Sequence, residues 1–246
     1  GIFAQNHISL SETMRKSALT LLLAAASLTT FAQEWKKDRP VSGFTGVSVN
    51  SGIDLYLTQG NSEKLTLEVK GFEEDEVRAE VKNGTLKLYV DRQGSWGMNW
   101  GRNRYVKAYL TFRSLQNLQA NGGADVSNQG TLQFNDLNLQ ANGGADVKLT
   151  LKANELNVQA NGGADVELRG SARRLNADGN GGADLEASKL TAEVVAARSS
   201  GGSDVYVYAT KEVSLEASGG ADLYYAGPAR VNGRRKSGGA DITFRD

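Results

Sequence analysis

The stretch Asn121-Gly122-Gly123-Ala124-Asp125 decides the fold, because close copies of it occur seven times along the chain. Every copy keeps Gly-Gly and a closing aspartate, and the closing aspartates are Asp125, Asp146, Asp165, Asp184, Asp204, Asp222 and Asp241. The intervals between them are 21, 19, 19, 20, 18 and 19 residues. A repeat of this length cannot bury an apolar face alone, so neighbouring copies must stack on one another. The period therefore predicts a solenoid.

Apolar and polar residues alternate on both sides of each Gly-Gly pair. Leu137 and Leu139 precede one pair in strict alternation with Asn138 and Gln140, and Val147 follows it. This period of two is typical of strands with one buried face. We therefore expect an all-β protein, a right-handed parallel β-helix with coils of about 20 residues. Each coil is expected to hold two short strands joined by a Gly-Gly corner, with a second turn before the next copy.

The composition of the corner follows from its geometry. The alternation places small alanines inside the bend, and glycine adopts positive φ without steric cost. Six of these structural turn glycines are Gly122, Gly123, Gly143, Gly144, Gly162 and Gly163. The aspartate after each corner must then point outward, so the stacked copies predict a column of carboxylates along one edge.

That column has three interpretations: structural turn aspartates, a weak ladder of cation sites, or contact with a ligand. The residues considered as metal ligands are Asp125, Asp146, Asp165 and Asp184. Calcium requires six to eight oxygen ligands, whereas each repeat supplies one aspartate without a second carboxylate at a fixed offset. We therefore predict a structural role and no cofactor, with weak calcium binding as the alternative.

Residues 1–32 are predicted to be an upstream extension followed by a signal peptide. Arg15 and Lys16 precede an apolar run over 18–28, and Ala32 ends a plausible cleavage site. The run is too short to span a bilayer, so we expect no integral membrane span in the mature chain. These features predict export to the periplasm or the outer cell surface of a Gram-negative bacterium.

The remaining chain, 33–246, is expected to form one continuous domain with an N-terminal β part over 33–114 and the seven repeats over 115–246. Within the first part, residues 47–57 resemble a degenerate copy of the repeat, and Asn83-Gly84 predicts a hairpin. The loop 91–104 interrupts the alternation with Trp96, Trp100 and Arg102. These residues suit ligand binding, or form a flap that buries its own aromatic rings.

Outward positions of the repeats carry three further patterns. Rows of Asn and Gln before the corners predict hydrogen-bonded ladders between coils. Tyr206 and Tyr224 follow their aspartates at outward positions. They have two interpretations: a binding strip for a glycan or protein, or cross-coil stacking of one ring on the other. Arg234, Arg235 and Lys236 replace apolar and small residues in the last copy, where charge protects an open sheet edge.

Composition favours binding over catalysis. The chain has 28 basic and 28 acidic residues and no cysteine, and its one histidine, His7, lies before the predicted mature start. This balance gives no reason to expect nucleic acid as a partner. We predict a non-enzymatic binding or scaffold protein that recognises a glycan or a cell-surface protein. The alternative is a carbohydrate-active enzyme that uses carboxylates, where Asp178 departs from the Gln of other copies.

The repeated Gly-Gly-Ala-Asp corner, the opening Arg39–Val47 and Leu86-Lys87-Leu88 after Asn83-Gly84 resemble one known family. It is the family described as putative auto-transporter adhesin, head GIN domain, which is common in Bacteroidetes-type bacteria. The resemblance covers about residues 40–246. It implies an exported parallel β-helix with an adhesin role, and it supplies no catalytic residues.

Overall fold

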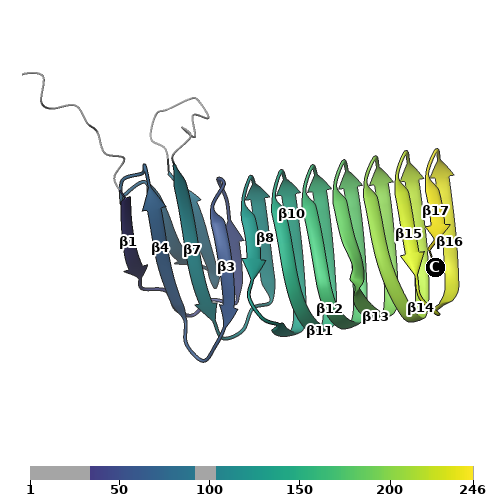
Figure 1. Ribbon diagram of the computed structural model, residues 1–246, viewed down its shortest axis with the longest axis horizontal. Helices are drawn as coiled ribbons and strands as arrows, with labels where there is room; N and C mark the ends of the chain where they lie inside the picture. Colours follow the sequence, from purple (N-terminus) through teal and green to yellow (C-terminus); the bar gives the residue numbers. More distant parts are fainter. Residues whose placement is uncertain (1–33, 92–103, 246) are drawn as a thin grey trace, which may run out of the picture.

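The computed structural model describes residues 34–91 and 104–245, and these residues form an elongated β-solenoid. Figure 1 shows the coils stacked in a row along the long axis, with the chain progressing from the N-terminal strands at one end to β17 at the other. The predicted signal peptide lies outside the described residues. No helix in the described part of the chain is long and apolar enough to cross a membrane.

The repeat region consists of parallel strands that pair with their equivalents one coil away. They are β8 (Asn117–Gly122), β9 (Asp125–Asn128), β10 (Leu132–Gly143), β11 (Asp146–Gly162), β12 (Asp165–Gly181), β13 (Asp184–Gly201), β14 (Asp204–Gly219), β15 (Asp222–Ala226), β16 (Arg230–Gly238) and β17 (Asp241–Phe244). Leu139 of β10 pairs with Val158 of β11, and Gly143 with Gly162, so the Gly-Gly corners lie in line. The predicted parallel solenoid is confirmed.

The far side of most coils differs from the expectation. β11 and β12 each run through 17 residues from one corner to the next, and β13 and β14 do so over 18 and 16 residues. The prediction of a second turn is wrong for these coils, because one strand continues around the far side. Its parallel pairing is interrupted there by register shifts, between Glu167 and Arg169 and between Ala187 and Thr191. A separate turn occurs after β9 and again after β15, where the strands are short.

The sequence predicts positive φ for both glycines of each corner, but only the first glycine has it. Gly162 has φ of 78° and Gly219 has φ of 77°, and the other first glycines are similar. The second glycines are absent from the positive-φ residues. A Cβ at Gly163 would lie 3.5 Å from the Gly143 carbonyl oxygen, which is ordinary van der Waals contact. The first glycine is therefore required by conformation, and the second is not.

The interior is a continuous apolar column of leucine, valine and alanine. The corner alanines are fully buried, as the alternation predicts, and they include Ala120, Ala124, Ala141, Ala145, Ala160 and Ala164. Wider parts of the coil hold Leu149, Leu156 and Leu168, each at most 2% exposed. Burying a side chain of this size contributes roughly 1.5–3 kcal/mol, so each coil gains its stability from contact with its neighbours.

The N-terminal part extends the same solenoid with strands that are out of sequence order. They are β1 (Glu34–Arg39), β2 (Gly46–Val49), β3 (Asp54–Gln59), β4 (Lys64–Lys70), β5 (Val77–Lys82), β6 (Thr85–Val90) and β7 (Tyr105–Phe112). β2 and β3 pair in parallel with β8 and β9, which confirms that residues 47–57 form a degenerate coil. On their other side they pair in parallel with β6 and β7.

The N-terminal end changes to antiparallel pairing. β4 pairs antiparallel with β7, and β1 with β4. β5 and β6 form the predicted hairpin, in which Asn83 and Gly84 have φ of 52° and 72°. Trp35 of β1 packs against the core and donates its indole N–H to the Phe72 carbonyl at 2.9 Å. These strands give the solenoid an end that differs from its middle.

Candidate functional site

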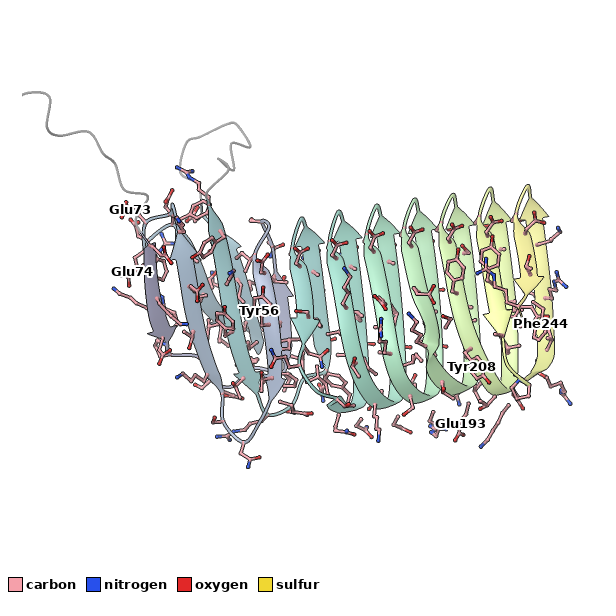
Figure 2. The ribbon with its side chains drawn as sticks, viewed as in Figure 1. Tyr56, Glu73, Glu74, Glu193, Tyr208 and Phe244 are labelled. Atoms are coloured by element: carbon pink, nitrogen blue, oxygen red, sulfur yellow. The ribbon has the colours of Figure 1, made fainter. Side chains whose placement is uncertain are left out.

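The outward aspartates form a single column, and it has one more member than the sequence predicts. Asp54 pairs in register with Asp125, Asp125 with Asp146, and the register continues from Asp146 through each later copy to Asp241. Asp54 follows the positive-φ pair Ser51-Gly52, which takes the place of Gly-Gly. The Ser51-Gly52 pair in the degenerate copy was therefore a sequence cue to this additional aspartate. We call the sheet surface that carries this column the aspartate face (Figure 2).

Lysines stand at both ends of the column. Lys107 of β7 pairs in register with Asp54, so it occupies the next position along the column. Lys107 lies 3.8 Å from Glu68, which in turn lies 3.2 Å from Lys36 of β1. At the other end, Lys236 contacts Asp241 at 2.9 Å. The uninterrupted row of carboxylates is thus bounded by positive charge on each side.

The carboxylates of the column remain at the surface, where water screens their repulsion. Successive strands lie about 4.8 Å apart, and two unit charges at that separation repel by roughly 1 kcal/mol in water. Burial, followed by neighbouring aspartates, raises the pKa of Asp54, Asp125, Asp165 and Asp204 above the ordinary value of 3.8. These four carboxyls therefore hold protons more tightly than isolated carboxyls do.

The backbone of the corner hydrogen-bonds to the neighbouring coil. The Asp146 N–H donates to the Ala124 carbonyl at 3.0 Å, and the Gly163 N–H donates to the Gly143 carbonyl at 2.8 Å. These donors are therefore used within the ladder. In the described part of the chain, no group of three or more His, Cys, Asp or Glu side chains is arranged to hold a metal ion. A column that supplies one carboxylate per coil is far from the six to eight oxygens that calcium requires.

Replacing one central aspartate tests this electrostatic description. We expect Asp165→Asn to raise the free energy of unfolding by about 1 kcal/mol at pH 7 and low salt, because two like-charged neighbours no longer repel it. The folded-state pKa of Asp165 is raised, so the folded state binds its proton more tightly than the unfolded chain. The ionised Asp165 side chain therefore destabilises the folded state at pH values above that raised pKa. This destabilisation disappears as the pH falls toward 3.8.

Urea unfolding at a series of pH values measures this effect. The stabilisation by Asp165→Asn should decline as the pH is lowered from neutral. Asp75→Asn, which removes the same charge from an exposed residue outside the column, is the matched control and should show little change at any pH. Equal behaviour of the two variants would refute the interaction within the column.

A second row of side chains runs beside the column, two residues after each aspartate. At its C-terminal end, Tyr206 and Tyr224 pair in register and their rings stack with centroids 4.7 Å apart and an angle of 10°. The Arg245 guanidinium lies 3.9 Å from the Tyr224 ring centroid and 5.0 Å from that of Tyr206. The Tyr224 hydroxyl donates to Asp222 at 3.3 Å. The cross-coil stacking that the sequence suggested is present, and the binding role of the pair stays a prediction.

The same row holds a second tyrosine pair that the sequence analysis missed. Tyr56 of β3 stacks on Tyr109 of β7, with centroids 5.1 Å apart and an angle of 16°. The two side chains are 36% and 37% exposed, and Lys36 lies 5.4 Å from the Tyr109 ring centroid. Both tyrosines occupy outward positions of alternating strands, which is a cue to exposure. Their pairing depends on β3 and β7 being neighbours, and the periodicity does not reveal that.

The opposite surface of the solenoid carries the predicted amide ladders. Asn142 donates to Asn121 and Asn161 to Asn142, both at 2.9 Å. A parallel row links Asn157 to Asn138 at 3.0 Å. In later coils ion pairs replace the amides, and Arg198 lies 3.6 Å from Asp178 and 3.4 Å from Glu216. Asp178, the residue considered for catalysis, is thus an ion-pair partner in the strand that precedes a corner.

The three aromatic-loop residues Trp96, Trp100 and Arg102 lie outside the described residues. Among the described candidates, the structure brings Asp125, Asp146, Asp165 and Asp184 into one column and places Tyr206 and Tyr224 beside its C-terminal half. The site is therefore a long surface strip rather than a cleft. Its repeated charges are flanked by an aromatic pair toward each end.

Fold and surface together define a class of protein, the parallel β-solenoids with an extended polar face. Within it, the family model described as putative auto-transporter adhesin, head GIN domain, matches residues 43–229. The chain belongs to this family, as the repeated corner indicated. No curated protein sequence matches the chain.

Solved structures of putative adhesins share the fold. One from Bacteroides fragilis is 24% identical, with a TM-score of 0.76, and the match covers 86% of this chain and 96% of that one. One from Parabacteroides distasonis is 17% identical, with a TM-score of 0.70 and coverage of 87% and 98%. A third structure, from the same species, is named a putative lipid binding protein; it is 17% identical, with a TM-score of 0.69 and coverage of 87% and 97%.

Proposed function

We propose that this protein is an exported, non-catalytic adhesin that recognises a glycan or a cell-surface protein through its aspartate face. The observation that carries the proposal is the cluster of Tyr206, Tyr224 and Arg245 on an exposed sheet surface. Tyrosine and arginine are enriched among the residues that dominate binding energy at interfaces. Family membership and the adhesin names of its structural relatives support the same role.

The rigidity of the face supports binding to an extended partner. Its strands from β3 to β15 are held on both sides by parallel neighbours, and the tyrosines are stacked across coils, so little side-chain entropy is lost when a partner binds. The repeated aspartates have equivalent surroundings in successive coils, whereas a catalytic centre is a unique arrangement of an acid and a base. These features favour recognition over glycoside hydrolysis.

Two expectations drawn from the sequence remain proposals. Export to the periplasm or cell surface accords with the adhesin family, and fractionation of cells that express the full chain would locate the protein. The calcium ladder remains the alternative to a purely structural column. Calorimetric titration with Ca²⁺ would decide between them, because a ladder must release or absorb heat that Asp146→Asn and Asp165→Asn reduce.

The binding role of the tyrosine cluster is testable with purified protein. We expect the double substitution Tyr206→Ala and Tyr224→Ala to weaken attachment to glycans or cells at least tenfold, since a central aromatic contact contributes about 2 kcal/mol. The measurement is a glycan array and a cell-attachment assay with labelled protein. Tyr89→Ala, on β6 of the opposite sheet, is the matched control. Attachment that is the same in the double variant and the control would remove this cluster from the proposal.

A further inference from the structure

The pair Tyr56 and Tyr109 differs from the C-terminal pair in what lies next to it. One face of the Tyr56 ring is covered by Tyr109, and the neighbouring strand on the other side places Ser127 in register with Tyr56. Serine is too small to cover an aromatic ring. At the C-terminal pair, by contrast, Glu186 is in register with Tyr206 and Arg245 lies over both rings. The face of the Tyr56 ring that is turned away from Tyr109 is therefore left uncovered by its small neighbour, Ser127.

The next large side chain in this row is Lys148, which is in register with Ser127. Tyr56 and Lys148 are thus two strand spacings apart, about 9.6 Å. A ring placed between these two side chains needs a van der Waals separation of about 4 Å from each of them. Both separations fit within this width, so there is room for one ring. We call this space, bounded by Tyr56, Ser127 and Lys148, the Tyr56 slot.

The strand beneath the slot is shorter than its equivalents in later coils. β9 ends at Asn128, while the equivalent strands of the later coils continue around the far side. The turn that follows is fixed by side chains: Gln59 accepts from the Gln133 N–H at 2.7 Å, and Asn128 accepts from the Thr150 N–H at 2.9 Å. The strand that carries Ser127 is therefore followed by a turn that side-chain hydrogen bonds hold in place.

Carboxylates line one side of the slot. Asp54 and Asp125 precede Tyr56 and Ser127 by two residues on their strands, and Asp146 stands in the same place before Lys148. Both Asp54 and Asp125 are close enough to raise the pKa of the Tyr56 hydroxyl, after the larger effect of burial. An aromatic face beside a row of hydrogen-bond acceptors matches a ligand with a flat apolar surface and several hydroxyl donors.

We propose that the Tyr56 slot binds one pyranose ring of an uncharged glycan, with the sugar stacked on Tyr56 and its hydroxyls donating to Asp54 and Asp125. This inference rests on the proposed function and names the ligand class and the place where it binds. Three carboxylates, Asp54, Asp125 and Asp146, stand beside the slot against the single cation Lys148, so glycans rich in uronic or sialic acid should bind less tightly than neutral ones. Because the sugar ring lies parallel to the Tyr56 ring, whose face is turned along the solenoid axis, the glycan chain leaves the slot across that axis.

A glycan array with neutral and acidic polysaccharides, followed by calorimetry with the best neutral oligosaccharide, tests the inference. Tyr56→Ala and Ser127→Leu should each weaken neutral-glycan binding at least tenfold, the first by removing the ring face and the second by filling the slot. Tyr56→Phe keeps the ring and should retain binding. Ser214→Leu makes the same change at an exposed position of the opposite sheet and should leave binding unaltered.

The outcomes separate this inference from the proposed function. Neutral-glycan binding that persists in both Tyr56→Ala and Ser127→Leu overturns the slot. Binding to acidic glycans alone overturns it as well, and so does the absence of glycan binding by a protein that still attaches to cells. In that last case the adhesin role stands, and the Tyr206 and Tyr224 substitutions remain its test. A melting temperature equal to that of the unsubstituted protein confirms that each variant is folded.

Discussion

Gly219→Ala should destabilise the solenoid by about 2–4 kcal/mol, while Gly220→Ala, one residue later, should change the free energy of unfolding by less than about 1 kcal/mol. Gly219 has φ of 77°, and a Cβ there would lie 2.9 Å from the Gly201 carbonyl oxygen. The substitution therefore combines left-handed backbone strain with a clash against the next coil. At Gly220 the nearest atom would be 3.5 Å away, and φ is not positive.

Urea unfolding monitored by far-ultraviolet circular dichroism measures both variants. Because each corner rests on the previous one, the displacement at Gly219 cannot be absorbed without moving the Gly201 corner. Gly220→Ala provides the control for the added methyl group and for the reduced freedom of the unfolded chain. Equal destabilisation by the two substitutions would show that the two corner glycines serve the same purpose, contrary to the structure.

Removing the charged residues from the last coil should convert the protein into a species that associates end to end. Arg234 and Lys236 are in register with the buried Leu215 and Ala217, so they occupy positions that point inward in the preceding coil. Arg234 donates to the Ile242 carbonyl across the open end of the coil, and Lys236 contacts Asp241. These two charged side chains stand at an end of the solenoid where Val231 and Phe244 are 41% and 49% exposed.

We expect Arg234→Leu with Lys236→Ala to expose a less charged strand edge and apolar interior, which pair with other molecules. Size-exclusion chromatography with light scattering should show larger species than the unsubstituted protein at the same concentration. Arg235→Ala is the control, since Arg235 is in register with the outward Glu216 of the same sheet. Figure 2 shows Phe244 at this end of the molecule, far from Glu73 and Glu74 at the other. An unaltered elution profile for the double variant would contradict the capping role.

The repeat part of the fold was predictable because its contacts are local copies of one pattern. Each coil places residue i against a residue about 19 positions away, so the alternation around one corner determines the register of all seven. The ladders from Asn121 to Asn161 followed from the same reasoning. The second turn was wrong because alternation alone does not distinguish two short strands from one strand that bends.

The candidate site was predictable only in part. The column from Asp125 to Asp241 and the exposed position of Tyr206 and Tyr224 follow directly from the repeat. Asp54 had a visible cue in the degenerate copy but was not counted. Lys107 was not predictable as a column residue, because the chain builds β7 beside β3 only after β4, β5 and β6 have been placed.

The sequence by itself determined the stacking of coils, the line of Gly-Gly corners, the alanine-lined bends and the outward carboxylates, because a period of two within a period of about 19 leaves one register that buries every apolar residue. The tertiary structure alone decided which side chains from the N-terminal strands meet the column. Tyr109 stacks on Tyr56 across 53 residues of sequence, and Ser127 falls on the other side, because the N-terminal strands are inserted out of order. The pairing of strands distant in sequence is a property of the whole core, and no local pattern encodes it.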